Sequence, residues 1–184
     1  QLDELFESYL RAEAEVEAEP YRKYREVLAE SCERAVLRRG LKLREGWRAK
    51  FADSLTTWPP FGDTVAALTR LKTRFKLGVL SNIDRDLFTG TAKLLEVPID
   101  FLVAAEDVMA YKPNHAHFRR MLEQHASKEE VVHVAQSQYH DGVPAKELGL
   151  AFVWINRYND PARNDVAPIG TFGSLMEFAE AAFR

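Results

Sequence analysis

The chain has 184 residues, a formal net charge of −3 and a pI near 6.0. With 46% hydrophobic and 29% charged residues it has the composition of a globular protein, large enough for one domain or a core with a small lid. These values give no indication of nucleic-acid binding, which would need a basic face, and no apolar run approaches the roughly 20 residues of a membrane span. The single cysteine, Cys32, excludes an internal disulfide and favours a cytoplasmic location.

The first part of the chain is predicted to be entirely helical. Apolar residues recur at helical spacing from Leu2, and a run of glutamates on the other face indicates a solvated surface. Pro20 is expected in the first turn of a second helix that ends at Gly40. A third helix carries Trp47 and Phe51 on one face. Two prolines at 59 and 60 break it, so we predict a helical cap over residues 1–58 and a second unit over residues 59–184.

From residue 61 short apolar segments alternate with helices. Strands are expected at 75–80, 101–105, 131–135 and 151–155, and helices at 63–73, 85–95, 143–148 and after the capping residues Asn114 and Ser174. Strands that alternate with helices predict an α/β fold with a parallel sheet and right-handed crossovers.

Polar residues follow the ends of these strands. Ser81 and Asn82 end the first strand, and Ser137 and Asp141 follow the third; Lys112 precedes a helix between them. Ligands of open parallel sheets bind at the carboxyl ends of the strands, so a site is expected there. Each residue alone has a structural alternative: a helix cap for Ser81 or Asn82, a helix cap or a structural acid paired with Lys112 for Asp141, and a solvent-facing ammonium for Lys112.

The order of these segments resembles the motifs of the haloacid dehalogenase-like hydrolase superfamily, and most closely its type II 2-haloacid dehalogenase branch. The residues that carry the resemblance are Ser81-Asn82, Tyr111-Lys112-Pro113 and Gln136-Ser137-Gln138-Tyr139-His140-Asp141. It implies a Rossmann-like core with a helical cap, and hydrolysis of a small carboxylate or halogenated substrate through an aspartyl ester.

The resemblance also implies roles for single residues. Ser81 and Asn82 would bind the leaving or transferred group, with Ser137 as a further substrate contact. Lys112 would keep the nucleophilic aspartate ionised, and Asp141 would position the water or the ammonium.

Departures from the family pattern favour the dehalogenase branch without securing it. Gln136 stands where the phosphatases carry an acid, and a neutral amide is a poor ligand for Mg²⁺. We therefore expect no cofactor; a Mg²⁺-dependent phosphatase of a small metabolite is the alternative. The Gln136-Ser137-Gln138 stretch and Phe118 also differ from the Ser-Ser-Asn stretch and the tyrosine of studied dehalogenases.

The histidines and Cys32 suggest no other mechanism. His115 and His117 are two positions apart on a helix and cannot share a metal ion. His133 lies inside a predicted strand and is interpreted as a core residue, like Cys32 on its helix, whereas His140 is expected to line the pocket.

The family's nucleophile lies on a first strand that this sequence lacks, because the chain starts within a helix at Gln1. That strand would run between the strands that precede Ser81 and Gln136. We expect a segment upstream of Gln1 to supply it; the alternative is a truncated, catalytically inactive binding member completed by a partner. An intact mass of 21.0 kDa would contradict the first expectation. A homodimer formed through an apolar face of the cap is a further expectation.

Overall fold

The computed structural model describes residues 2–184, which divide into two compact units. The first comprises the chain up to Pro59 together with the segments Asn82–Leu94 and Ala104–Tyr111. The second comprises Pro60–Ser81, Leu95–Val103 and Lys112–Arg184. Each unit is described by itself.

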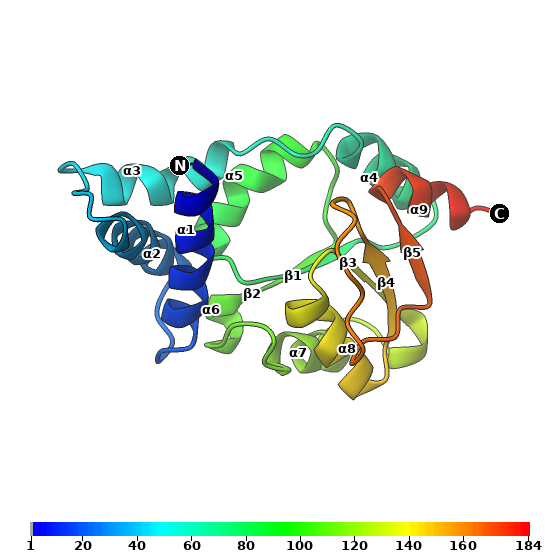
Figure 1. Cartoon of the computed structure of the whole chain (residues 1–184). Coiled ribbons are helices and arrows are strands. Elements are labelled where there is room, and N and C mark those ends of the chain that lie inside the picture. The colour runs from blue at the N-terminus through cyan, green and yellow to red at the C-terminus, as the bar shows by residue number, and fades with distance from the viewer. Residues whose placement is uncertain (1) are drawn as a thin grey trace. The chain divides into compact units, whose positions relative to one another are not determined.

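The first unit is helical. Its helices are α1 (Leu2–Glu17), α2 (Tyr24–Arg38), α3 (Trp47–Ser54), a 3₁₀ turn (Leu55–Thr57), α5 (Arg85–Leu95) and α6 (Ala105–Val108). Figure 1 shows α1 beside α2, and Ser8 of α1 donates a hydrogen bond to the carbonyl of Ala35 in α2. Val16, Val27 and Ala105 form a core with Tyr111, which buries one face of each helix.

The ends of α2 test two predictions. Gly40 ends the helix as predicted, with a left-handed φ of 68°. In this conformation the Gly40 amide donates to the carbonyl of Leu37, and the Leu41 amide donates to the carbonyl of Val36. The placement of Pro20 was wrong, because α2 begins only at Tyr24. Pro20 lies in the connection from α1, and the amides of the first turn are capped by a distant residue, Asp84.

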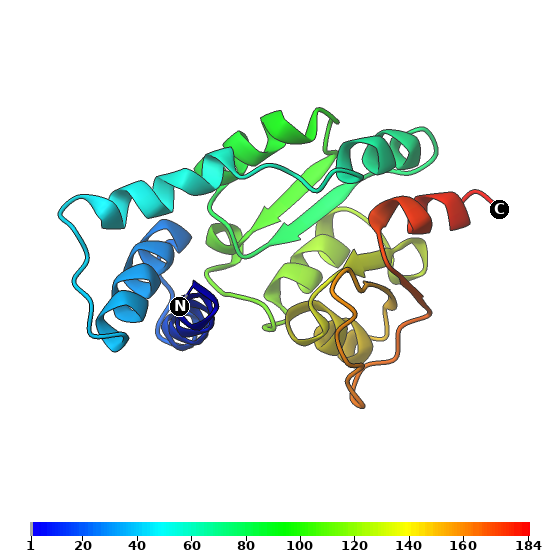
Figure 2. The same cartoon turned by 45° about the horizontal axis from the view of Figure 1, so that its top comes forward.

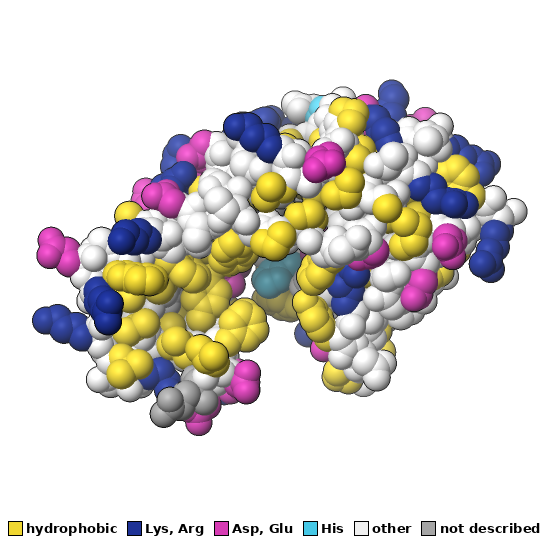
Figure 3. Space-filling model, turned by 90° about the horizontal axis from the view of Figure 1, so that it is seen from above, with side chains coloured by type: hydrophobic (Ala, Val, Ile, Leu, Met, Phe, Trp, Pro, Cys, Tyr) yellow, Lys and Arg dark blue, Asp and Glu magenta, His cyan; other side chains and the backbone are white. Residues whose placement is uncertain are grey.

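Large hydrophobic side chains gather on one face of this unit (Figure 3). Those exposed on α1 are Leu2, Phe6 and Leu10, spaced one turn apart, so one stripe of the helix faces outward. None of the described helices has both the length and the apolar character needed to cross a bilayer. The homodimer stays a prediction.

The second unit contains the strands. Its elements are α4 (Thr64–Lys72), β1 (Gly78–Ser81), β2 (Phe101–Ala104), α7 (Ala116–Gln124), a 3₁₀ turn (Lys128–Glu130), β3 (Val132–Ala135), a π-helical turn (Gln138–Gly142), α8 (Val143–Leu148), β4 (Ala151–Ile155), β5 (Gly170–Phe172) and α9 (Leu175–Ala181). Ser174 accepts a hydrogen bond from the amide of Glu177 and caps α9, as predicted.

The strands of this unit form two sheets. β3, β4 and β5 are parallel in that order, with His133 opposite Phe152 and Val153 opposite Gly170. β1 and β2 form a separate pair whose arrows point the same way in Figure 2. The predicted parallel α/β architecture is confirmed. Within the described residues β1 and β3 are not hydrogen-bonded neighbours, which agrees with a core that lacks its first central strand.

The first strand begins at Gly78, three residues later than predicted. Asp100 explains the shift: it accepts a hydrogen bond from the Leu77 amide with its side chain (2.6 Å) and donates its own amide to the Leu77 carbonyl (2.8 Å). A Cβ at position 78 would lie 2.0 Å from the ring of Phe101, so only glycine allows this close approach of ring and backbone.

Candidate active site

Lys112 lies in the segment ahead of α7, and its side chain is only 10% exposed. The ammonium donates to the carbonyl of Leu80 in β1 (2.9 Å) and to Oδ1 of Asp141 after β3 (2.7 Å). A buried ammonium is stable only when it is paired and hydrogen-bonded. The solvent-facing alternative for Lys112 is therefore wrong, and the structure brings two predicted site residues, Lys112 and Asp141, into direct contact.

Asp141 sits in the π-helical turn and is 5% exposed. The same Oδ1 that binds Lys112 also accepts a hydrogen bond from Nε2 of His133, at 2.8 Å. Burial alone would raise the pKa of Asp141. The hydrogen bond from His133 and the positive charge of Lys112 more than offset burial and lower this pKa to about 2. Asp141 is thus a carboxylate at every ordinary pH.

His133 is a site residue that the sequence interpretation assigned to the core. It does pack in the core, with its ring 4.9 Å from that of Phe118 and 6.3 Å from that of Phe152. Its Nε2 nevertheless reaches Asp141, and an ionised carboxylate only accepts hydrogen bonds, so Nε2 carries a proton. The available signal was a polar residue inside an apolar strand that leads into the motif of Asp141.

Ser81 ends β1, and its carbonyl accepts a hydrogen bond from Nε2 of the fully buried His117 at 3.2 Å. His115 instead contacts Glu147 at 2.6 Å, so the two histidines have different partners. The carbonyls of Leu80 and Ser81, the last two residues of β1, are both bound by side chains of the segment that follows β2.

Ser137, predicted to contact substrate, caps the π-helical turn. Its Oγ accepts from the amide of His140 (3.0 Å) and lies 3.1 Å from Nδ1 of the same residue. Gln136 donates its side-chain amide to Asp160 (3.0 Å) and its carbonyl accepts from the indole of Trp154 (2.9 Å). The substrate role of Ser137 stays a prediction.

Asn82 belongs to the helical unit. Its side-chain amide is 3.5 Å from Oε1 of Glu17, the last residue of α1. Asp84, two residues later, is completely buried and accepts hydrogen bonds from the amides of Tyr24 and Arg25 at the start of α2. Sequence reasoning missed Asp84, because an acid ahead of a helix looks like an ordinary cap for that helix.

The donor set of the described residues is a poor fit for Mg²⁺. Among them no cluster of three histidine, cysteine or acidic side chains has the geometry of a metal site. Asp141 already holds an ammonium at 2.7 Å, whose positive charge would repel a divalent cation, and Gln136 is bonded to Asp160.

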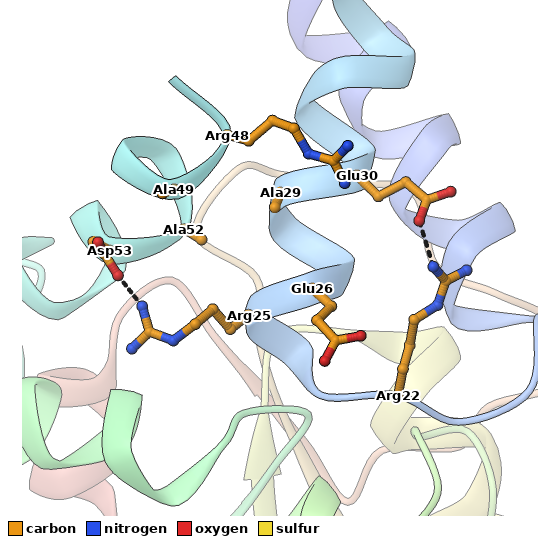
Figure 4. Close-up of a pocket in the computed structure, with 9 residues that line it drawn as sticks. All are labelled: Arg22, Arg25, Glu26, Ala29, Glu30, Arg48, Ala49, Ala52 and Asp53. Carbon is orange, nitrogen blue, oxygen red and sulfur yellow. Dashed lines mark hydrogen bonds and ion pairs between the residues drawn. The ribbon is translucent and has the colours of Figure 1, made fainter. Parts of the chain in front are cut away.

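A separate cavity of about 340 Å³ lies in the helical unit between α2 and α3 (Figure 4). Three arginines and three carboxylates line it together with alanines: Arg22, Arg25, Arg48, Glu26, Glu30 and Asp53. Arg22 binds Glu30 and Arg25 binds Asp53, as the dashed lines of Figure 4 mark. The charges that line this cavity are matched in number, and two of its three arginines are already paired with carboxylates of the lining.

Comparison with known proteins agrees with this architecture. The sequence model of the haloacid dehalogenase-like hydrolases matches residues 2–155. An (S)-2-haloacid dehalogenase of Pseudomonas fluorescens is 27% identical over 123 residues, which cover 65% of this chain but only 54% of that protein. The chain thus spans about half the length of this curated relative.

Solved structures share the fold. A dehalogenase with an intermediate complex has a TM-score of 0.88 at 20% identity, covering 97% of this chain and 83% of the other. The L-2-haloacid dehalogenase of Xanthobacter autotrophicus with covalently bound chloropropionic acid has a TM-score of 0.79 at 18% identity, covering 99% and 83%. A putative hydrolase from Bacillus subtilis bound to magnesium has a TM-score of 0.75 at 16% identity, covering 96% and 78%.

Proposed function

Because the chain belongs to the haloacid dehalogenase-like hydrolase family, we propose that it hydrolyses a small 2-halogenated carboxylate through an aspartyl ester. The observation that carries the proposal is the buried pair of Lys112 and Asp141 at the carboxyl ends of β1 and β3. A paired lysine and an ionised aspartate suit a reaction that handles anions, and the neutral amide of Gln136, bonded to Asp160, favours halide release over Mg²⁺-dependent phosphate release.

The proposed reaction has two steps. An aspartate, expected from a segment upstream of Gln1, attacks the carbon that bears the halogen; a C–O bond forms and the halide leaves with the electron pair. Water then attacks the ester carbonyl, so the hydroxy acid leaves, the aspartate is restored and a proton is released. Lys112 would hold the charge of the nucleophile, and Asp141 would position the water. Ser81 and Asn82 would receive the halide.

The names of the relatives support this substrate class. The curated relative is a 2-haloacid dehalogenase, and one structural neighbour holds chloropropionic acid covalently. We propose 2-chloropropionate as the first substrate to assay, and the reducing cytoplasm suggested by the single Cys32 as the setting.

Lys112→Met tests the proposal, since it keeps the length of the side chain and removes the ammonium. Halide release from 2-chloropropionate should fall by about 100-fold or more, because one donor to developing charge contributes about that much. Lys146→Met, at an exposed position of α8, is the matched control and should release halide at the wild-type rate. Circular dichroism of both variants reports whether the fold is kept.

Each assay is run with EDTA and with Mg²⁺, and phosphate release from para-nitrophenyl phosphate is measured in parallel. Halide release that is insensitive to EDTA supports the proposal, whereas Mg²⁺-dependent phosphate release replaces it with the phosphatase alternative. Unchanged halide release in Lys112→Met contradicts the role of Lys112. These assays use the protein together with the segment expected upstream of Gln1. If neither product then forms while 2-chloropropionate still binds, the protein is an inactive binding member.

A further inference from the structure

We propose that Asp84 is a positioning residue that joins the loop carrying Asn82 to helix α2. This inference rests on the proposed function only in that Asn82 is taken to bind the leaving halide. The contacts themselves lie within the helical unit and are independent of any substrate.

Helix α2 lacks a cap of its own. Its N-cap residue, Lys23, makes no capping side-chain hydrogen bond, although the first amides of a helix need acceptors. Asp84 supplies acceptors for two of these amides: its Oδ1 accepts from the amide of Tyr24 at 3.1 Å, and its Oδ2 accepts from the amide of Arg25 at 3.0 Å. A carboxylate at a helix N-terminus also faces the positive end of the helix dipole, so its charge is stabilised there.

The burial of Asp84 makes these contacts decisive. The residue is 0% exposed, and a buried carboxylate persists only where hydrogen bonds replace its lost hydration. The backbone carbonyl of Asp84 accepts from the amide of Phe88 at 3.0 Å, in the first turn of α5. One residue thus starts two helices, and its side chain ties them together.

Neighbouring residues bind the same loop to the rest of the unit. Arg85 donates its amide to Glu106 (2.7 Å) and its guanidinium to Asp107 (2.7 Å), and the carbonyl of Ile83 accepts from the amide of Ala105 (3.1 Å). The position of Asn82, whose amide lies 3.5 Å from Glu17, is therefore set by α1, α2 and α6.

The pKa of Tyr21 responds to the charge of Asp84 and can be used to follow it. The hydroxyl of Tyr21 is buried and has no hydrogen-bond partner among the described residues. Burial, and then the negative charge of Asp84, raise the pKa of Tyr21 to about 12. Removing the charge of Asp84 should lower this pKa, a change that can be followed without any turnover.

The test uses Asp84→Asn in the full chain, which keeps the shape of the side chain and removes its charge. Amide exchange at Tyr24 and Arg25 should accelerate about tenfold, because one helix cap contributes about that factor. Asp86→Asn is the matched control: its exposed side chain lies in the first turn of α5 and contacts the guanidinium of Arg25, not the first amides of α2. It should leave amide exchange, the Tyr21 titration and turnover unchanged.

The kinetic readout separates positioning from mere stabilisation. A residue that binds the leaving halide gains strength as negative charge develops, so misplacing Asn82 should lower kcat with little change in KM. The loss in Asp84→Asn should be about tenfold for 2-chloropropionate and smaller for 2-bromopropionate, whose better leaving group needs less assistance. Asp84→Ser, with a hydroxyl that can cap α2, replaces Asp84→Asn if the latter does not fold.

Unchanged amide exchange at Tyr24 and Arg25 would overturn the proposal, and so would faster exchange with the wild-type kcat and the wild-type chloride-to-bromide ratio. If the wild-type protein that includes the segment upstream of Gln1 releases no halide, the proposed function fails, and the positioning claim is then decided by nuclear magnetic resonance of the Asn82 side-chain amide. Its signals should shift in Asp84→Asn but not in Asp86→Asn; signals that stay in place would reject the claim.

Discussion

Asp141 shows how a single carboxylate oxygen can make stability depend on pH. Its Oδ1 binds both Lys112 and His133, and its native pKa of about 2 lies below the value of about 3.9 in an unfolded chain. A lowered native pKa stabilises the fold above the unfolded pKa, and that stabilisation is lost as pH falls toward the native pKa. We expect about 2 kcal/mol of unfolding free energy to disappear between about pH 4 and pH 2.

Urea unfolding of the wild type and of Asp141→Asn at a series of pH values measures this contribution. The variant should be less stable at pH 6, because Lys112 is left without its carboxylate, and should lose less stability below pH 4. Asp3→Asn, at an exposed position of α1, controls for the loss of one carboxylate. Parallel curves for the wild type and Asp141→Asn would disprove the coupling.

At the scale of single residues, the sequence predicted Lys112 and Asp141 as site residues but not His133 and Asp84, which hold the surrounding structure in place. Lys112 and Asp141 follow different elements of a parallel fold, and the rule for strand ends brings such residues together. The roles of His133 and Asp84 were not predicted, because their partners are set by packing. His133 reaches the turn beyond its own strand, and Asp84 caps a helix that begins 60 positions earlier in the chain. A polar residue inside an apolar strand was the one local signal for His133, but it does not identify Asp141 as the partner, and no local pattern connects Asp84 with α2.

Among the elements, the junction of the π-helical turn with α8 leaves no room for a side chain at Gly142. A Cβ added at Gly142 would lie 2.7 Å from Cγ1 of Val166 and 3.0 Å from the ring of Phe152. The φ of Gly142 is −66°, which any residue can adopt, so the constraint is packing alone. Gly142→Ala should lower the unfolding free energy by about 1–3 kcal/mol and displace the adjoining Asp141.

A double substitution identifies the cause. Val166→Ala removes the closest methyl groups, so the double variant should be more stable than the sum of the two single losses predicts. Gly62→Ala is the control, because nothing lies within 4 Å of a Cβ built there. Strictly additive losses in urea unfolding would show that Val166 is not the obstacle.

The elements also show where local patterns suffice. The helices Arg85–Leu95 and Val143–Leu148 have the predicted bounds, since their apolar spacing and their flanking turns agree. β5, over Gly170–Phe172, was not predicted, because three residues carry no period and its place is fixed by pairing with β4. The π-helical turn was missed as well, since its register follows from the contacts of Asp141.

On the scale of the whole molecule, the division of the strands into two sheets sets unequal stability. β4 has neighbours on both sides, whereas within the described residues β1 is paired with β2 alone. A two-stranded sheet is marginal by itself. The ammonium of Lys112 links the carbonyl of Leu80 in β1 to Asp141 beyond β3, so one buried side chain connects the two sheets.

Hydrogen exchange of the 184-residue chain should therefore resolve the two sheets. Amides of β1 and β2 should exchange at least about tenfold faster than those of β4, because opening the smaller sheet breaks fewer contacts than global unfolding does. Lys112→Met removes this link between the sheets, so the exchange rate of the β1 amides should rise further. The exchange rate of the β4 amides relative to the rate of global unfolding should stay constant. The exposed-site variant Lys146→Met should reproduce the wild-type pattern, and equal protection of all strands in the wild type would show that the sheets open as one unit.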